Sequence, residues 1–177
     1  DIQQNLFSVI SNKDSYIFDC VIIATGGLSY PTTGSTGDGY RFAKMVGHTV
    51  TELKPALCGM NIDGNWFKDL QGLALKNVSI TIKNGNKVLY DDFGEMLFTH
   101  FGVSGPIVLS ASSRINRLPI NNLMITLDLK PALDDAQLDK RILRDFEAAG
   151  KKHLQNSLDE LLPRAIIPVI IKGAGLD

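Results

Sequence analysis

The pattern of apolar and polar residues predicts strands at the start of the chain. Residues 6–10 alternate between two faces, residues 11–14 are turn formers, and residues 15–19 resume an extended pattern. Residues 20–24 are continuously apolar and largely β-branched, which is typical of a strand buried on both faces. We therefore expect a hairpin followed by a buried strand.

A loop and a short helix follow these strands. Almost every residue from 28 to 39 is a turn or loop former, and residues 40–46 place apolar side chains at helical spacing before Gly47. Residues 48–53 predict a further strand that leaves this helix.

The middle of the chain has the alternation of a half-buried sheet. Val78, Ile80 and Ile82 share one face of a predicted strand over residues 77–83. Asn84-Gly85-Asn86 predicts a hairpin, residues 87–90 its return strand, and residues 95–99 and 123–129 two more strands. A helix beginning at Ser104 is expected over residues 106–115. Residues 53–130 thus read as a mainly antiparallel β unit.

The last part of the chain is predicted to be helical. Asp134 or Asp135 can cap a helix that places Leu138, Ile142 and Phe146 on one face. Residues 156–162 and 164–172 suggest further helical turns. The fold class expected is α+β, with three parts that cover residues 1–52, 53–130 and 131–177.

Charge and composition limit the classes of partner and the cellular location that are expected. The 177 residues carry a formal net charge of -1, which favours neither nucleic acid nor an anionic membrane as a partner. No apolar run approaches the roughly 20 residues of a membrane span. Both cysteines, Cys20 and Cys58, are expected to be buried and reduced, and a cytoplasmic location fits. Because the chain opens at Asp1 without Met and stops at Asp177, we expect an internal fragment.

The end of the buried strand is the first candidate for a ligand site. Ala24, Thr25, Gly26 and Gly27 are small, so the backbone there can approach a planar or phosphorylated ligand at the carboxyl end of a strand. Buried strands also end at glycine for packing reasons alone, and the four residues by themselves do not decide between the two interpretations.

The loop ahead of the helix strengthens the ligand interpretation. Residues 33–39, Thr-Gly-Ser-Thr-Gly-Asp-Gly, precede a helix N-terminus, where free N–H groups suit an anion or an electron-rich ring edge. Asp38 taken singly is a helix cap. No Gly-x-Gly-x-x-Gly follows a strand, so the phosphate-binding half of a dinucleotide site is not expected in these residues.

Two separated stretches resemble a known family. Residues 24–31 (ATGGLSYP) with residues 34–40 (GSTGDGY) and Gly47-His48, and later residues 94–106 (GEMLFTHFGVSGP), are similar to NAD(P)/FAD-dependent oxidoreductases called the aminoacetone oxidase or 3-dehydro-bile-acid reductase family. Leu162-Pro163-Arg164 resembles that family's helical segment. The resemblance covers essentially the whole chain.

The resemblance implies a fold, a cofactor and a set of contacts. Such proteins are about twice as long and have a two-dinucleotide-fold FAD domain interrupted by an inserted β-barrel and helical unit. Residues 1–52 would then be part of the FAD domain and residues 53–177 most of the insert. The residues expected to contact FAD are Ala24, Thr25, Gly26, Gly27, Ser35, Thr36, Gly37, Asp38 and Gly39. Two partners are expected: the remaining FAD-domain segments of the same polypeptide, and a small-molecule substrate. The resemblance implies an amine, a carbonyl compound or a steroid-like enone as that substrate. It does not decide whether NADH or NADPH donates electrons or whether oxygen accepts them. The alternative is a non-catalytic cap or interaction module that binds no cofactor.

Catalytic residues are harder to assign from the sequence. His100 follows a predicted strand and is a candidate for proton donation or for bonding a flavin carbonyl, although a structural role in a loop is the simpler interpretation. Tyr30 suits either stacking on a ring or packing in its loop. The three histidines and two cysteines show no metal-ligand spacing, so no metal is expected.

Overall fold

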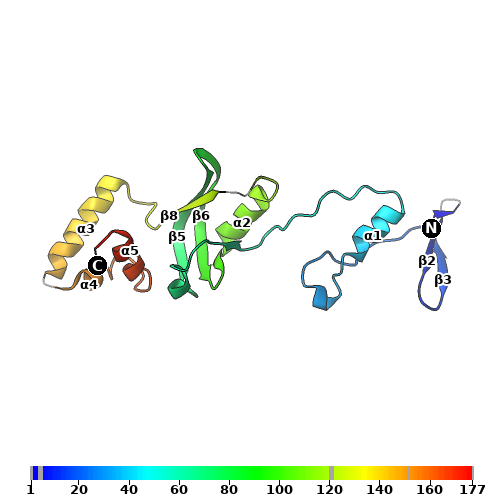
Figure 1. Ribbon diagram of the computed structural model, residues 1–177, viewed down its shortest axis with the longest axis horizontal. Coiled ribbons are helices and arrows are strands. Elements are labelled where there is room, and N and C mark those ends of the chain that lie inside the picture. Colours follow the sequence, from blue (N-terminus) through cyan, green and yellow to red (C-terminus); the bar gives the residue numbers. More distant parts are fainter. Residues whose placement is uncertain (1, 4–5, 120–121, 151, 177) are drawn as a thin grey trace. The chain divides into compact units, whose positions relative to one another are not determined.

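The chain folds into two compact units. The computed structural model describes residues 2–3, 6–119, 122–150 and 152–176, and the units comprise Asp1–Leu53 and Lys54–Asp177. Figure 1 shows helices and antiparallel strands in both units, which confirms the α+β class.

The first unit begins with a small antiparallel sheet of order β1-β2-β3. Its strands are β1 (Ile2–Gln3), β2 (Leu6–Ile10) and β3 (Ser15–Phe18). The Ser11 N–H donates to the Asp14 carbonyl over 2.8 Å and closes the turn between β2 and β3. This hairpin confirms the first strands that the sequence predicts.

The next two predicted strands are wrong. Residues 20–24 and 48–53 have no regular secondary structure, and Ile22 is 90% exposed. An isolated strand cannot satisfy its backbone groups, and no described strand pairs with either segment. The apolar side chains around Ile22 are also uncovered, since no described side chain of the first unit is buried.

The predicted short helix is present. After the 3-10 turn η1 (Pro31–Thr33), helix α1 covers Asp38–Met45. It ends in a left-handed Gly47, with the Gly47 N–H bonded to the Lys44 carbonyl and the His48 N–H to the Ala43 carbonyl. This Schellman arrangement satisfies carbonyls at the end of the helix.

The second unit is built on a five-stranded antiparallel sheet of order β4-β7-β6-β5-β8. Its strands are β4 (Met60–Asn61), β5 (Ala74–Asn84), β6 (Lys87–Thr99), β7 (Gly102–Ser104) and β8 (Leu123–Asp128). Register shifts along β5 and β6 curl the sheet into a half-barrel, as the long β5–β6 hairpin shows in Figure 1. The predicted hairpin at 84–87 is confirmed, while the two strands predicted for residues 87–90 and 95–99 are one continuous β6.

One helix packs against this sheet and contributes to its core. Helix α2 (Pro106–Ile115) has Pro106 in its first turn and Gly105 as its cap, so the predicted start at Ser104 is wrong, because Ser104 still belongs to β7. Val108 and Ala111 of α2 and Ile80, Ile82 of β5 are completely buried in the core. The 3-10 turn η2 (Lys68–Leu70) adds Leu70 to it.

The tail of the chain is helical, as predicted. Helix α3 (Asp135–Ala149) is followed by α4 (Leu154–Ser157) and α5 (Ile167–Gly173), so the turns predicted at 156–162 and 164–172 are shifted. The side chains on the predicted face of α3 pack against a second core cluster made by Leu158, Leu161, Ile167 and Ile171. Ile166 reaches the sheet core.

Two expectations about exposure can be compared with this fold. Cys20 and Cys58 are both free thiols and both exposed, so the predicted burial is wrong: neither lies on a sheet face that another layer covers. None of the helices in the described residues is long and apolar enough to cross a membrane.

Candidate functional site

The two glycine-rich stretches of the first unit lie against each other. The Gly37 N–H donates to the Gly27 carbonyl over 3.0 Å. A Cβ on Gly39 would lie 2.6 Å from Thr25 Oγ1, and one on Gly26 would lie 2.7 Å from Ser35 Oγ. The structure therefore brings residues 24–27 next to residues 35–39, which are the cofactor contacts that the resemblance implies.

Glycine is also required here by the backbone. Gly26 has φ 71° and Gly37 has φ 83°, in the left-handed region that favours glycine. Gly37 is the N-cap of α1 and turns the loop into the helix. A side chain at either position would also meet a neighbour, Ser35 Oγ at 2.7 Å from Gly26 and Leu28 Cδ2 at 2.7 Å from Gly37.

Asp38 has a different role from the predicted cap. Gly37 occupies the cap position, and Asp38 is the first residue of α1. Its carboxylate accepts hydrogen bonds from Arg41 Nη2 over 3.0 Å and from Thr36 Oγ1 over 3.2 Å. These bonds, first the one from Arg41 and then the one from Thr36, hold the pKa of Asp38 below its usual value. A negative charge accordingly occupies the positive end of the helix dipole.

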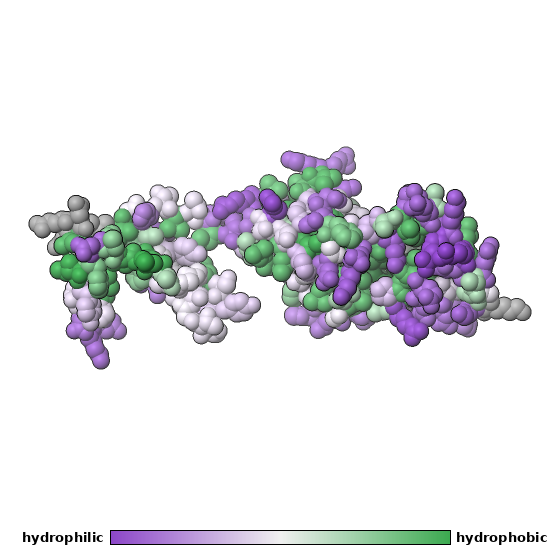
Figure 2. Space-filling view, turned by 180° about the vertical axis from the view of Figure 1, so that it is seen from behind, coloured by the Kyte–Doolittle hydropathy of each residue, from purple (hydrophilic) through white to green (hydrophobic). Residues whose placement is uncertain are grey.

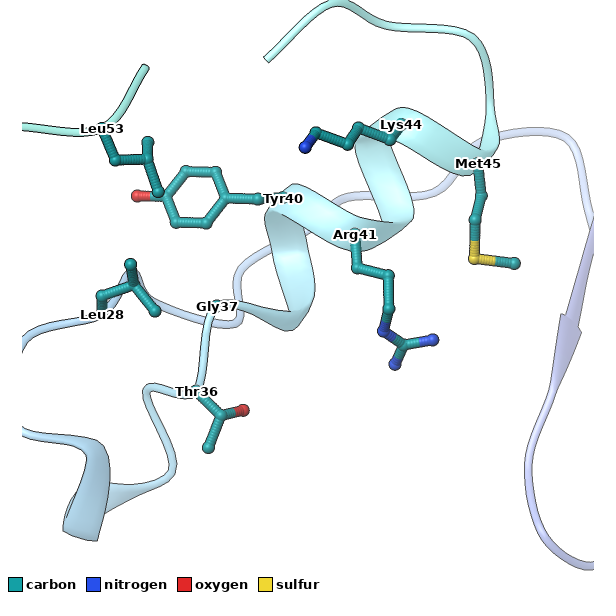
Figure 3. A pocket seen from close by; sticks show the side chains of 8 residues that line it. All are labelled: Leu28, Thr36, Gly37, Tyr40, Arg41, Lys44, Met45 and Leu53. Atoms are coloured by element: carbon teal, nitrogen blue, oxygen red, sulfur yellow. The ribbon is translucent and has the colours of Figure 1, made fainter. Parts of the chain in front are cut away.

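An open pocket of about 550 Å³ lies beside this loop, all of it within the first unit. In Figure 3 the Tyr40 ring extends from α1 toward Leu53, with Leu28 below it, and the Lys44 side chain runs along the same side. The remaining lining residues are Thr36, Gly37, Arg41 and Met45. Leu28 and Leu53 are 54% and 44% exposed, so the apolar wall of the pocket is uncovered.

Tyr30 is not packed in its loop. It has φ 55°, unusual for a residue with a side chain, and its side chain is 80% exposed. Thr33 holds this conformation by donating its N–H and its hydroxyl to the Tyr30 carbonyl. Of the two roles that the sequence suggests for Tyr30, packing in its loop is excluded, and stacking on a ligand stays a prediction.

His100 lies in the second unit, in the two-residue turn between β6 and β7. Its ring is exposed and contacts Phe101 edge-on, with the ring centres 5.0 Å apart. The second family-like stretch around it has a packing role, because a Cβ on Gly105 would lie 2.9 Å from Met96 Cα. His100 and the glycine loop belong to different units.

The second unit also has a groove that the sequence pattern does not indicate. It has a volume of about 970 Å³ and lies between β4 and β8, the two edges of the half-barrel. The alternation of residues 123–128 indicated only a half-buried strand, and nothing local shows which face stays open. Within the described residues, no group of three or more His, Cys, Asp or Glu side chains could hold a metal ion.

The structure is that of an α+β protein. Its first unit carries the glycine loop, and its second unit has a curled antiparallel sheet and a helical tail. Residues 54–177 match the family described as HI0933-like protein barrel and H2TH domain, and the chain belongs to this family. The resemblance to FAD-dependent oxidoreductases that the motifs indicate is thereby confirmed at the level of the family.

Curated relatives with assigned activities extend the comparison. The chain is 26% identical over 168 residues to the 3-dehydro-bile acid delta(4,6)-reductase of Clostridium scindens, covering 94% of the chain and 41% of that protein. It is 30% identical to the ribosomal RNA dihydrouridine synthases of Escherichia coli, over 83% of the chain and 34% of that protein, and of Haemophilus influenzae, over 86% and 35%. The chain therefore spans 34% to 41% of the length of these relatives.

Proposed function

We propose that this chain is part of an FAD-dependent oxidoreductase, in which the first unit forms one wall of the flavin site and the second unit covers the substrate. The observation that carries the proposal is the contact between the two glycine-rich stretches. Residues 24–27 and 35–39 pack with no room for side chains at Gly26 and Gly39. This packing holds the two stretches side by side, so that their backbone and hydroxyl groups can contact one large flat ligand.

The residues present fit a flavin in their chemistry. Ala24 to Gly27 and Ser35 to Gly39 offer backbone and hydroxyl groups, and Tyr40 and Leu28 supply an apolar wall beside them. FAD, when bound, supplies the redox chemistry by accepting and passing on a hydride. The residues of this chain bind and orient the ring and exclude water from it.

The charge of the loop favours one portion of the cofactor. Asp38 carries its negative charge at the N-terminus of α1, where a phosphate would otherwise bind. A carboxylate repels the pyrophosphate of FAD but accepts hydrogen bonds from hydroxyl or N–H groups. We therefore assign the loop to the ring and the ribityl hydroxyls, and the pyrophosphate to other parts of the protein.

The partner of the first unit is proposed to be the rest of an FAD domain in the same polypeptide. No described side chain of this unit is buried. Green, hydrophobic patches are visible on this unit in Figure 2. Ile10 and Ile17 are each 70% exposed, and Ile22 is 90% exposed. Exposed apolar surface on this scale marks an interface. The full domain would then also supply the strand neighbours that residues 20–24 lack.

A cytoplasmic location is proposed for such an enzyme.

A small molecule is the proposed substrate. Four arginines that could contact phosphates are paired with carboxylates instead: Arg41 with Asp38, Arg141 and Arg144 with Asp145, and Arg164 with Asp159. The formal net charge is -1. Two relatives are named as acting on ribosomal RNA, so RNA binding by the full-length protein, measured against salt concentration, is the contrasting test.

His100 is proposed as the proton donor of the full-length protein. A His100→Gln variant of that protein should retain its flavin and lose turnover. Retained turnover would contradict a proton-donor role for His100. The edge-on contact of its ring with Phe101 would then be its role.

The direct experiment is to purify the full-length protein and record the visible absorbance of bound flavin. The proposal predicts a yellow protein, or an apoprotein that FAD reconstitutes. A colourless protein that FAD cannot reconstitute would contradict it and would favour the alternative, a cap or interaction module without a cofactor.

A further inference from the structure

The five-stranded sheet of the second unit is an open barrel. In the order β4-β7-β6-β5-β8, the strands β4 and β8 are edges with no strand on their outer sides among the described residues. The family to which residues 54–177 belong is nevertheless described as having a barrel. An edge strand presents free N–H and C=O groups that can pair with another strand.

The burial of β8 shows that its inner face lacks a neighbour. Ile80 and Ile82 of β5 are 0% exposed, whereas their cross-strand partners on β8, Leu127 and Ile125, are only half-buried. These side chains continue the core on the same face of the sheet, because directly paired residues point the same way. The core therefore reaches the surface along β8.

The groove of about 970 Å³ lies where this core surface is open. Ile125 and Leu127 line it from β8, Met60 lines it from β4, and Ile115 lines it from α2. The groove thus has an apolar floor between the two edges of one sheet, with polar residues such as Asn61, Asp63 and Asn122 also in its lining. An occupant in extended conformation can fill the groove with side chains and bond the free edge with its backbone.

We propose that this groove receives one β-strand from the same polypeptide, outside these 177 residues, and that this strand pairs with β8 to close the barrel. Its side chains alternate, with apolar residues facing Ile125 and Leu127 and polar residues facing outward. The relatives are long enough to supply such a strand, since the chain covers only 34% to 41% of them.

The position of the groove argues for a single segment rather than a second copy of the chain. The groove lies between two edges of the same curled sheet, so its occupant must be narrow. The edge of another folded sheet carries its own helices and loops into the contact. This inference rests on the sheet and the family and stands apart from the flavin proposal.

Photo-crosslinking on the full-length protein tests the inference. A photoreactive residue is placed at Met124, which is 64% exposed on the outer face of β8. Residues directly opposite on a neighbouring strand lie about 5 Å away. We expect one intramolecular crosslink to Lys83, its partner on β5, and a second to a segment outside residues 1–177.

The matched control is the same photoreactive residue at Ser79. Ser79 lies on β5, which is paired on both sides, between Phe93 of β6 and Asp128 of β8, so its crosslinks should stay within residues 54–177. From Met124, a crosslink only to Lys83, or one between two copies of the protein, would overturn the inference.

Amide hydrogen exchange gives an independent result that does not need a variant. In the full-length protein, all amides of Leu123–Asp128 should exchange slowly, by roughly 100-fold or more relative to an unstructured chain, because paired amides of a core sheet open rarely. Fast exchange at alternate residues of β8 would show a free edge and overturn the inference, including when a small molecule fills the groove. Flavin absorbance of the same sample reports on the proposed function separately.

Discussion

Thr25 and Gly39 meet so closely that the second residue has no space for a side chain. A Cβ on Gly39 would lie 2.6 Å from Thr25 Oγ1 and 3.1 Å from Ile23 Cγ2. Thr25 is β-branched, so its side chain has few alternative rotamers. This contact fixes the loop of residues 24–27 on the first turn of α1, where the proposed flavin contacts lie.

The first prediction concerns this contact. Gly39→Ala should destabilise the full-length protein by about 1–3 kcal/mol, because overpacking forces the loop away from the helix. The control is Gly173→Ala in α5, where an added Cβ meets nothing within 4 Å, and it should leave stability unchanged or slightly raise it. Chemical denaturation measures both. Equal effects of the two substitutions would contradict the packing described for Gly39.

A second prediction concerns the segment that leads into the half-barrel. Ser112 is 5% exposed, and its hydroxyl accepts the Cys58 N–H over 3.0 Å while donating to the Leu109 carbonyl. Ser112→Ala should cost about 1–2 kcal/mol, since the Cys58 N–H loses its partner. Ser113→Ala removes only an exposed bond to the Ser110 carbonyl and should cost less than about 0.5 kcal/mol. A smaller cost for Ser112 than for Ser113 in denaturant unfolding would refute this assignment.

The third prediction concerns the start of α3. Asp134 accepts the Gln137 N–H over 2.8 Å, and the Gln137 side chain accepts the Asp134 N–H in return. Asp134→Ala should therefore lower stability by about 1 kcal/mol. Asp135→Ala, one residue later, should cost only a few tenths of that through the helix dipole. Thermal unfolding that ranked the two variants in the opposite order would exclude the capping box.

The fourth prediction concerns the pH dependence of Tyr90. Burial, together with the hydrogen bond that its hydroxyl donates to Asp92 Oδ2, raises the pKa of Tyr90 to about 12. Because the folded pKa lies above the unfolded one, the associated stability is complete below pH ~10 and is lost as pH rises toward 12. The difference in ultraviolet titration between the protein and its Tyr90→Phe variant isolates this group. In an Asp92→Asn background the pKa should fall. An unchanged value would mean that Asp92 does not act on the hydroxyl.

The sequence predicted well those helices and strands whose turn residues, caps and apolar faces lie within the element itself. The β5–β6 hairpin follows from the turn residues Gly85 and Asn86 together with the alternation before them, and α3 follows from Asp134 and its apolar face. Both elements find their partners within the same unit. The strand at 20–24 depends instead on neighbours that no described residue supplies, so its apolar pattern appears as exposed coil.

In the candidate site too, features set by the local sequence could be predicted, whereas contacts between distant residues could not. The glycine positions could be predicted, but their purpose could not, because the contacts from Gly39 to Thr25 and from Gly26 to Ser35 join residues that lie apart in sequence. Asp38 was predicted as a cap because its residue type is typical of caps, and the left-handed Gly37 took that place. The groove beside β8 depends on the order of five strands and is invisible to any local pattern.

The claim that the glycine loop contacts the flavin is tested most directly by titrating the full-length apoprotein with FAD in two matched variants. Gly26 and Gly34 both have positive φ, so alanine strains the backbone at either, but only at Gly26 does the new Cβ meet another group, Ser35 Oγ at 2.7 Å. Because either Ser35 or the loop must then move, Gly26→Ala should weaken FAD binding by about tenfold or more, equivalent to about 1.4 kcal/mol, while Gly34→Ala binds like the unaltered protein. Equal FAD affinity in all three proteins would contradict the assignment of this loop to the flavin site.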